Sequence, residues 1–327
     1  MTAKYSALCL LLFSACCSGC IIERDNDFVH CKSIEELYQV SDYKEFKYVV
    51  ITNKGDGNSS IIKNDAFNGM NLEVLTIIGN VSQIEPHALR GIKHPTFKFT
   101  VIDSTLEELP ETLINGLPLL GFEVTLTHVK ELKRNFFKDI PLVNRTYIKR
   151  NKITTIGSDV FCGTNISTLD LSRNIIATIE DGAFACMKKL AELYLSGNRL
   201  TTFDAAKVLG DSSSIKILNL DKNLLTTVSP LPTLSNLRTL SFERNAISRI
   251  ESRSFIKLPE LEELHLPFNK LKSIPNDTLP EHLTKLAIGE NPWTCSYLAE
   301  LKQWAKHFNV QLMCVHFGKL CTISCVE

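Results

Sequence analysis

Cysteine is the residue type with the plainest chemistry in this chain of 327 residues, which contains 11 of them. Cys9, Cys16 and Cys17 fall in residues 1–19, where Lys4, a short apolar run and a series of small residues predict a cleavable export signal. Its removal leaves an even number of cysteines, which after an export signal predicts disulfide bonds rather than thiols. The remaining eight are Cys20, Cys31, Cys162, Cys186, Cys295, Cys314, Cys321 and Cys325.

Two other interpretations of the cysteines stay open at this point. Residues 13–16 (FSAC) or 17–20 (CSGC) could be a bacterial lipoprotein processing site instead of a signal cleavage region. Zinc binding is disfavoured, because the eight cysteines that follow the predicted signal include no C-x-x-C pair and no histidine lies at ligand spacing from them. Export agrees with five N-x-S/T sequons, which begin at Asn58, Asn80, Asn144, Asn165 and Asn276.

Charge and motif content exclude several classes of function. The 36 basic residues balance the 36 acidic ones, so bulk charge would not recruit nucleic acid or an anionic membrane. No apolar run reaches the about 20 residues of a membrane-spanning helix, and the C-terminus shows no lipidation signal, so we expect a soluble, secreted protein. Nucleophile elbows, phosphate loops and H-E-x-x-H motifs are absent from the sequence. We therefore expect a protein without enzymatic activity, cofactor or metal.

An internal repeat supplies the elements that must position these residues. The segment ISTLDLSRNII, residues 166–176, recurs downstream with weaker copies upstream, and successive copies from Leu72 onward begin 22 to 25 residues apart. This spacing gives about eleven repeats across residues 46–291. The copies begin at Phe46, Leu72, Thr96, Leu119, Val143, Ile166, Leu190, Ile215, Leu237, Leu261 and Leu283.

The pattern L-x-x-L-x-L-x-x-N-x-L of these copies resembles that of leucine-rich repeats. Apolar residues at positions 4 and 6 alternate with polar ones, as in a strand with one buried face. Such short strands need neighbours, so each would pair in parallel with the strand of the next repeat. The fold class predicted is therefore α/β, a leucine-rich repeat solenoid (horseshoe) with a parallel concave β-sheet and disulfide-stapled caps. A phenylalanine near position 19 would fill the convex side, as in Phe161, Phe184 and Phe255.

Asparagine at position 9 would satisfy backbone groups that the turn after each strand leaves unpaired. Ser104 and Thr127 replace it upstream, which predicts a less regular N-terminal third. Asn80 shares this position with a sequon, and we expect it to be buried rather than glycosylated. Glycans are expected at Asn58, Asn144, Asn165 and Asn276. The ladder residues are Asn151, Asn174, Asn198, Asn223, Asn245, Asn269 and Asn291.

Two cysteine pairs follow from the repeat and the caps. Cys162 and Cys186 lie one repeat apart at nearly the same phase, which predicts a bridge on the convex side, with two buried thiols as the alternative. Cys20 and Cys31 flank a short segment and would staple an N-terminal cap of residues 20–45.

Residues 292–327 resemble the C-terminal flanking module of extracellular leucine-rich repeat proteins. Trp293 would plug the last repeat and a short amphipathic helix would follow. The family staples this module from a C-x-C pair, of which only Cys295 exists here, with Tyr297 in the second place. The resemblance implies a bridge from Cys295 to Cys314. Cys321 and Cys325 would then close a local loop or bond another chain, giving a disulfide-linked dimer.

The concave face predicts a mixed-charge, protein-binding surface over residues 145–268. Strand position 5 and loop position 8 carry aromatic and basic residues, which often anchor protein interfaces. The alternative is a face charged only for solubility, and His265 is interpreted as a surface residue rather than a catalytic one. The candidates are Arg145, Tyr147, Lys149, Arg150, Asp170, Arg173, Tyr194, Asn219, Asp221, Lys222, Glu243, Arg244, His265 and Phe268.

A signal peptide, a short cysteine-bounded cap, about ten repeats and a following cysteine motif resemble the secreted leucine-rich repeat immune proteins of mosquito haemolymph. The chain has no coiled-coil heptads, so it would resemble a coil-less member. This resemblance implies a recognition protein of innate immunity that binds a protein partner, such as a complement-like thioester protein, or a microbial surface. The alternative is an extracellular-matrix or adhesion protein that organises other macromolecules.

Overall fold

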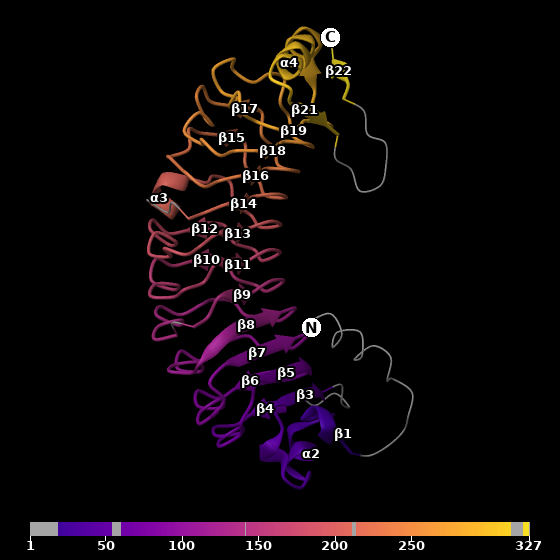
Figure 1. The fold of residues 1–327 in the computed structure, drawn as a ribbon, viewed down its shortest axis with the longest axis vertical. Helices are drawn as coiled ribbons and strands as arrows, with labels where there is room; N and C mark the ends of the chain where they lie inside the picture. The colour runs from indigo at the N-terminus through magenta and orange to yellow at the C-terminus, as the bar shows by residue number, and fades with distance from the viewer. Residues whose placement is uncertain (1–18, 54–59, 141, 211–213, 315–322, 327) are drawn as a thin grey trace.

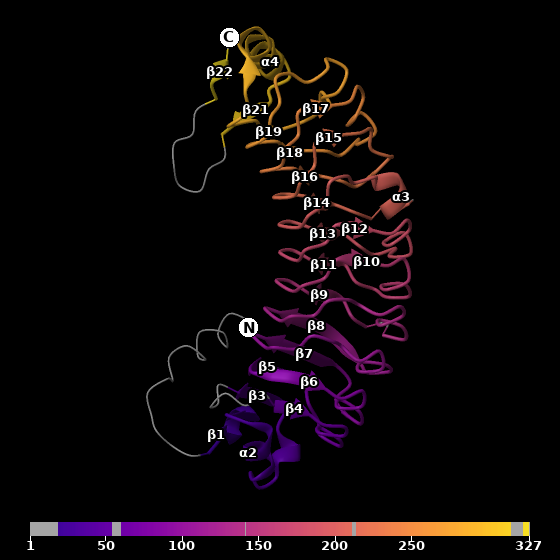
Figure 2. The ribbon, with the colours of Figure 1, turned by 180° about the vertical axis from the view of Figure 1, so that it is seen from behind.

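The computed structural model describes residues 19–53, 60–140, 142–210, 214–314 and 323–326. The predicted signal peptide apart from Gly19, the first two residues of the sequon at Asn58, and Cys321 lie outside these residues. The described chain forms an arc, with the N-terminal repeats at one end and the C-terminal helix at the other (Figures 1 and 2).

A sheet of 14 strands runs along the inner side of the arc (Figure 1). All neighbouring strands are parallel except β1 and β2, which are antiparallel. Eleven strands, from β3 to β19 in spatial order, belong to the repeats, as the sequence predicts. The strands in order are β1 (Ile21–Glu23), β2 (Phe28–Cys31), β3 (Tyr48–Asn53), β5 (Val74–Gly79), β7 (Phe97–Ile102), β8 (Leu119–Thr125), β9 (Arg145–Tyr147), β11 (Thr168–Asp170), β13 (Glu192–Tyr194), β14 (Ile217–Asn219), β16 (Thr239–Ser241), β18 (Glu263–His265), β19 (Lys285–Ala287) and β21 (Gln311–Met313).

The hydrophobic positions of the repeat explain this arrangement. Leu169, Leu193 and Leu218 are paired in register on neighbouring strands and are fully buried. Burial of each leucine contributes about 1.5–3 kcal/mol, but only when the next repeat covers it. The solenoid predicted from the repeat is confirmed.

The N-terminal strands are longer than those that follow. Strands β3, β5 and β7 contain six residues and β8 seven, whereas the repeat strands from β9 onward contain three. A series of buried phenylalanine rings supports this region, with neighbouring ring centroids 5.0–6.3 Å apart. The series comprises Phe97, Phe99, Phe122, Phe136, Phe137, Phe161 and Phe184.

Turns and short strand pairs form the outer side of the arc (Figure 1). Three parallel pairs lie there, and one connection contains the helix α3 (Ala205–Leu209). Phe161, Phe184 and Phe255 are fully buried beneath these turns, as expected. The pairs are β4 (Ser60–Ile62) with β6 (Val81–Ile84), β10 (Thr155–Ile156) with β12 (Thr178–Ile179), and β15 (Thr227–Val228) with β17 (Arg249–Ile250).

The asparagine ladder joins adjacent repeats. In Asn198, Oδ1 accepts a hydrogen bond from the Ile176 amide at 3.0 Å, and Nδ2 donates to the carbonyls of Leu171 and Leu195 at 3.1 and 2.9 Å. Asn80 does not join this ladder, contrary to expectation. It is half-buried, and its Oδ1 accepts from the Thr105 hydroxyl at 3.1 Å instead. The longer strand accounts for this, because β5 stays paired with β3 as far as Gly79 and the Asn80 amide donates to the Asn53 carbonyl at 2.8 Å.

The N-terminal cap contains a hairpin and two short helical segments. The 3-10 turn η1 (Arg24–Asn26) links β1 to β2, and α2 (Ile34–Tyr38) and η2 (Tyr43–Glu45) follow. A disulfide joins Cys20 to Cys31, and another joins Cys162 to Cys186 in adjacent repeats, so both predicted pairs are confirmed.

The C-terminal cap is closed differently from the prediction. Trp293 is fully buried and donates from Nε1 to the Ile288 carbonyl at 2.9 Å, and Leu298 and Leu301 of α4 (Cys295–His307) are buried. Cys295, however, bonds to Cys325, so the expected Cys295–Cys314 bridge is wrong. The expected Cys321–Cys325 loop and an interchain bond from Cys325 are wrong for the same reason. Cys314 is itself disulfide-bonded.

Strand pairing explains the observed bridge. The strand β22 (Cys325–Val326) lies parallel to β20 (Trp293–Thr294), with Cys325 opposite Trp293. This pairing places Cys325 beside the start of α4, where Cys295 lies. Tyr297 packs on Trp293 with 5.7 Å between ring centroids, and burial raises the pKa of its hydroxyl. An aromatic contact therefore fills the place of the missing cysteine.

Candidate protein-binding surface

The concave surface comprises the outward side chains at positions 5, 7 and 8 of the repeats from β9 to β18. Strand register sets its first row, because position 5 of each strand lies beside position 5 of the next. Tyr147 is opposite Asp170, which is opposite Tyr194, and the row continues along the later strands. Its further members are Asn219, Ser241 and His265.

Two tyrosines thus flank an aspartate in the middle of the arc. The ammonium of Lys149 lies 5.1 Å from the Tyr147 ring centroid and 3.7 Å from Asp170 Oδ2. The Tyr194 hydroxyl donates to Glu192 Oε2 at 3.2 Å. Burial raises the pKa of Tyr194 to about 12, and the carboxylates of Glu192 and Asp170 add to the shift. Negative potential therefore surrounds the Tyr194 ring. Elsewhere in the same row, Lys149 of the chain itself already binds Tyr147 and Asp170 as a cation.

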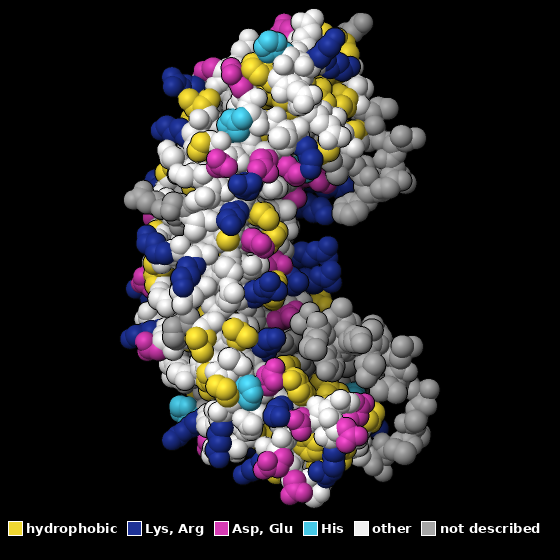
Figure 3. All heavy atoms as spheres, in the orientation of Figure 1, with side chains coloured by type: hydrophobic (Ala, Val, Ile, Leu, Met, Phe, Trp, Pro, Cys, Tyr) yellow, Lys and Arg dark blue, Asp and Glu magenta, His cyan; other side chains and the backbone are white. Residues whose placement is uncertain are grey.

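A second row, the basic column, consists of Arg150, Arg173, Lys222 and Arg244 at position 8. All four have positive φ, between 53° and 57°, and all four are exposed. Their backbone amides donate to carbonyls of the next repeat, as Lys222 does to Glu243 at 2.7 Å. The turn that links the repeats therefore fixes the column. Figure 3 shows Lys and Arg side chains gathered on the inner edge at the middle of the arc.

Gly197 occupies position 8 between Arg173 and Lys222, with φ 69°. A Cβ at Gly197 would lie 3.3 Å from Arg173 Cγ. The glycine therefore leaves room for the Arg173 side chain to lie across the neighbouring turn.

Arg244 is held by two neighbours at the C-terminal end of the column. Its guanidinium carbon lies 4.4 Å from the Phe268 ring centroid, and Nε donates to Glu243 Oε1 at 3.0 Å. Cation–π contacts of exposed groups contribute about 0.5–1 kcal/mol, so this pair orients the guanidinium more than it stabilises the fold.

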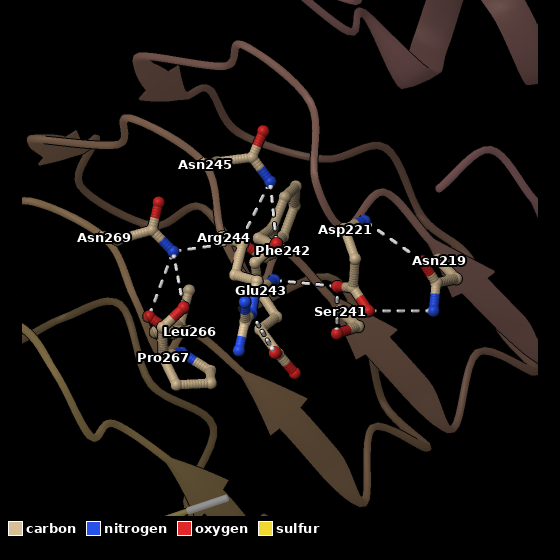
Figure 4. A network of polar contacts seen from close by, with 10 residues as sticks. All are labelled: Asn219, Asp221, Ser241, Phe242, Glu243, Arg244, Asn245, Leu266, Pro267 and Asn269. Atoms are coloured by element: carbon tan, nitrogen blue, oxygen red, sulfur yellow. Dashed lines mark hydrogen bonds and ion pairs between the residues drawn. The ribbon is translucent and has the colours of Figure 1, made fainter. Parts of the chain in front are cut away.

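Asp221 lies in a network of hydrogen bonds beneath the basic column (Figure 4). Its carboxylate accepts from the Ser241 hydroxyl at 2.5 Å, the Glu243 amide at 2.7 Å and Asn219 Nδ2 at 3.0 Å. Burial raises the pKa of the Asp221 carboxyl above its ordinary 3.8, although these hydrogen bonds oppose the shift. Asn219 and Asp221 therefore shape the surface from within rather than offering free groups to a partner.

The structure brings the candidate residues together along one face, with Arg145 at the start of β9. Sequence reasoning missed Glu192, which binds Tyr194, and Glu263, whose carboxylate lies 2.5 Å from Lys285 Nζ and 3.4 Å from His265 Nε2. Both stand at strand position 3, which the alternation of side chains also points outward. That alternation was the signal that could have found them.

Two absences concern only the residues that the structure describes. Among them, no group of three or more His, Cys, Asp or Glu side chains could hold a metal ion. Within the same residues, no helix combines the length and the apolar character needed to span a bilayer.

Comparison with protein families identifies two leucine-rich repeat models along the chain. The model described as "Leucine rich repeat" matches residues 141–200 and 213–271, and the "BspA type Leucine rich repeat region (6 copies)" matches residues 36–137. The change of model near residue 140 coincides with the change from long to short strands at β9.

Similar proteins include podocan of Mus musculus, 28% identical over 62% of this chain, and osteomodulin of Bos taurus, 26% identical over 53%. The chain spans 37% of podocan and 54% of osteomodulin. Among solved structures, the fold resembles a chain of an octameric complex of latrophilin 3, Unc5D and FLRT2, with a TM-score of 0.69, 16% identity, and coverage of 91% of this chain and 92% of that one. It also resembles a chain of the Toll–Spatzle complex of Drosophila, with a TM-score of 0.63, 22% identity, and coverage of 76% and 35%.

Proposed function

The chain is a leucine-rich repeat protein, and from that premise we propose that it is a secreted recognition protein that binds a protein partner through its concave surface. The single observation that carries the proposal is the row Tyr147, Asp170 and Tyr194 beside the exposed basic column. Tyrosine and arginine are enriched among the residues that dominate binding energy at interfaces, and a rigid sheet presents them without a cost for ordering the backbone.

The charges define the partner's complementary groups. A cationic side chain of the partner would lie over the Tyr194 ring, between the carboxylates of Asp170 and Glu192. Acidic groups of the partner would contact Arg150, Arg173 and Lys222 along the basic column. The two rows run in parallel along the arc, so a partner with opposite charges on two sides would bind in one orientation only.

Export is part of the proposal. Two disulfides, Cys20–Cys31 and Cys295–Cys325, staple the two caps, and such bonds persist in oxidising compartments. The solved complexes that share the fold contain partner proteins, which supports a protein ligand for this concave surface.

Innate immunity is the role that we propose for this recognition, on the resemblance of the sequence to the mosquito haemolymph proteins. A complement-like protein or a microbial surface would be the target. The names podocan and osteomodulin among the relatives favour a second candidate, an extracellular-matrix protein that organises other macromolecules. Induction by microbial challenge and presence in body fluid would support the first role, and retention in insoluble matrix the second.

Alanine substitution of Arg173, Tyr194 and Arg244 together tests the binding surface. The triple variant should capture its partner from native extracellular fluid about tenfold less well, or worse, with little change in melting temperature. The control is a triple alanine variant of Arg249, Arg253 and Lys257, which are exposed outside the concave sheet. The proposal would be contradicted if the first variant captured its partner as well as the unsubstituted chain, or if the control variant lost partner capture to the same extent.

A further inference from the structure

Two buried threonine hydroxyls differ from every other buried polar side chain that the structure describes. Oγ1 of Thr146 and Oγ1 of Thr278 are the buried side-chain atoms without a hydrogen-bond partner, and both residues are 0% exposed. A buried hydroxyl without a partner destabilises a fold, because it loses its bonds to water and gains none. Packing alone therefore gives no reason for either threonine.

Thr146 interrupts the apolar core. It lies in register with Phe122 on one side and Leu169 on the other, and both are buried. The corresponding residue of every later repeat strand is leucine, as in Leu193 and Leu286.

Thr278 occupies the place that Ser254 holds one repeat earlier. The Ser254 hydroxyl donates to the carbonyls of Glu251 and Val228 at 2.6 and 3.2 Å, so that repeat satisfies its buried hydroxyl. The Thr278 hydroxyl is oriented without such an acceptor. Neither threonine is therefore explained by the repeat to which it belongs.

What the two threonines share is the third place of an N-x-T sequon. The sequons begin at Asn144 and Asn276, and both asparagines are exposed. We infer that Asn144 and Asn276 carry N-linked glycans, and that Thr146 and Thr278 are retained because sequon recognition requires a hydroxyl residue there. Because both hydroxyls are buried in the folded chain, recognition precedes folding. The inference rests on the proposed export.

The other described sequons behave differently. They begin at Asn80 and Asn165 and end in Ser82 and Ser167, whose hydroxyls donate to the Ser60 carbonyl and to Asn144 Oδ1 respectively. These serines have a structural role in the folded chain, so the argument from an unexplained hydroxyl does not extend to them.

The geometry of Asn144 suits attachment. Its Oδ1 accepts a hydrogen bond from the Ser167 hydroxyl, whereas its Nδ2 makes no hydrogen bond to the described residues. Nδ2 would form a bond to the anomeric carbon of a lipid-linked oligosaccharide. The bond from that carbon to the lipid diphosphate breaks, so the diphosphate leaves with the electron pair and the amide nitrogen loses one proton.

The glycan at Asn144 would border the concave surface. Asn144 immediately precedes β9, at the edge where the repeat strands begin, and the basic column lies beyond the edge where they end. A bulky, hydrated group at the first edge leaves the basic column as the open approach for a partner.

Site mapping in the secreted full-length chain tests the inference. The protein is produced in a eukaryotic secretory host, released from its glycans by a glycosidase in ¹⁸O-labelled water, and analysed by peptide mass spectrometry. Labelled Asp at 144 and 276 is the expected result, and secreted chains unlabelled at both positions would overturn the inference. A chain that stays inside the cell would overturn the proposed export as well, so the two failures are distinguishable.

A second measurement asks whether the hydroxyl serves the sequon or the fold. In the secreted chain, Thr146→Ser should keep the glycan at Asn144 and Thr146→Val should abolish it. In an Asn144→Gln background, which carries no glycan there, adding Thr146→Val should raise the melting temperature, because a methyl group replaces an unpaired hydroxyl. A lower melting temperature would show that the fold itself uses the hydroxyl, and would overturn the inference. The same pair of variants applies to Asn276 and Thr278.

Discussion

Arg150, Arg173, Lys222 and Arg244 have left-handed backbone conformations, which cost a residue with a Cβ about 1–2 kcal/mol. Gly197 occupies the same place in the series, so glycine satisfies the turn. Long basic side chains at these positions thus weaken the fold slightly while remaining exposed. The same conformation recurs at position 8 of other repeats, as in Asp103, Leu126 and Glu290, so it belongs to the turn that links the repeats, and the side chain is what distinguishes the basic column.

The first prediction at the residue scale concerns Lys222. Lys222→Gly should raise the free energy of unfolding by up to about 1 kcal/mol, because relief of the left-handed strain outweighs the added freedom of the unfolded chain. It should also weaken partner binding. Denaturant titration and a binding assay measure the two effects.

Arg253 offers a matched control for this prediction, since it also has positive φ, 63°, and is exposed outside the concave sheet. Arg253→Gly should stabilise the fold and leave binding unchanged. If Lys222→Gly left partner binding unchanged, the basic column would serve solubility rather than binding.

The second prediction at this scale is a pH dependence. The folded chain raises the pKa of Asp221 above its ordinary 3.8, so the folded state binds the proton more tightly than the unfolded state. The charged Asp221 carboxylate lowers the free energy of unfolding near neutral pH. This loss is recovered as pH falls through the folded pKa towards 3.8. Urea titrations from about pH 7 to about pH 4 give the free energies of unfolding of the unsubstituted chain and of Asp221→Asn. The difference between them should shift in favour of Asp221→Asn as pH rises. A difference independent of pH would contradict this assignment.

Residue positions were predictable to the extent that they follow the repeat. The period gives which side chains face outward, so Tyr147, Tyr194 and Arg173 could be placed from the sequence. It does not give what each side chain touches. The contact of Tyr194 with Glu192 and the hydrogen bonds of Asp221 depend on rotamers and strand register, which a spacing pattern does not encode.

At the scale of elements, the asparagine ladder replaces the hydrogen bonds that the turns cannot make. Each ladder asparagine has its Nδ2 bonded to carbonyls of two repeats, as Asn223 donates to Leu195 and Leu220, both at 3.0 Å. A repeat strand of three residues forms few hydrogen bonds of its own, so the ladder carries much of the link between repeats.

Asn198→Ala tests this link. The substitution leaves the buried Ile176 amide without a partner and removes one of the two side-chain donors from the carbonyls of Leu171 and Leu195, so it should lower the free energy of unfolding by about 1–3 kcal/mol. Asn80→Ala is the matched control, because Asn80 is half-buried and lies outside the ladder. Equal losses in the two variants, measured by denaturant titration, would contradict the special role of the ladder.

The elements themselves were largely predictable, and for a physical reason. Eleven copies of one pattern must bury the same faces, so the repeat specifies the parallel sheet. The replacements of asparagine by Ser104 and Thr127 indicated an irregular N-terminal third, but not its longer strands. Strand length depends on how far the backbones of neighbouring repeats stay paired, as from Tyr48 to Asn53, which the hydrophobic spacing does not fix.

For the whole molecule, the caps close the two open ends of the sheet. At the C-terminal end the chain returns after α4 and places Cys325 beside β20, 30 residues from Cys295. No periodic signal links these segments, which is why the sequence led to the wrong partner. The N-terminal pair was predictable, because Cys20 and Cys31 lie only 11 residues apart.

Cys295→Ser/Cys325→Ser should release β22 and lower the free energy of unfolding by about 2–4 kcal/mol, since the bond closes a long loop of the unfolded chain. Peptide mapping of the native protein without reduction should recover a fragment that joins Cys295 to Cys325. Recovery of Cys295 joined to Cys314 would contradict the structure of the cap.

The bond between Cys162 and Cys186 has a mechanical consequence. Successive repeats contact mainly their neighbours, so a force pulling the ends of the arc apart would peel repeats away one at a time. The segment between Cys162 and Cys186, a separation of 24 residues, cannot be stretched while the disulfide is intact. The contour length of the stretched chain is therefore shorter by roughly 80 Å. Near the middle of the arc the molecule thus contains a built-in stop to elongation, which a reducing agent would remove.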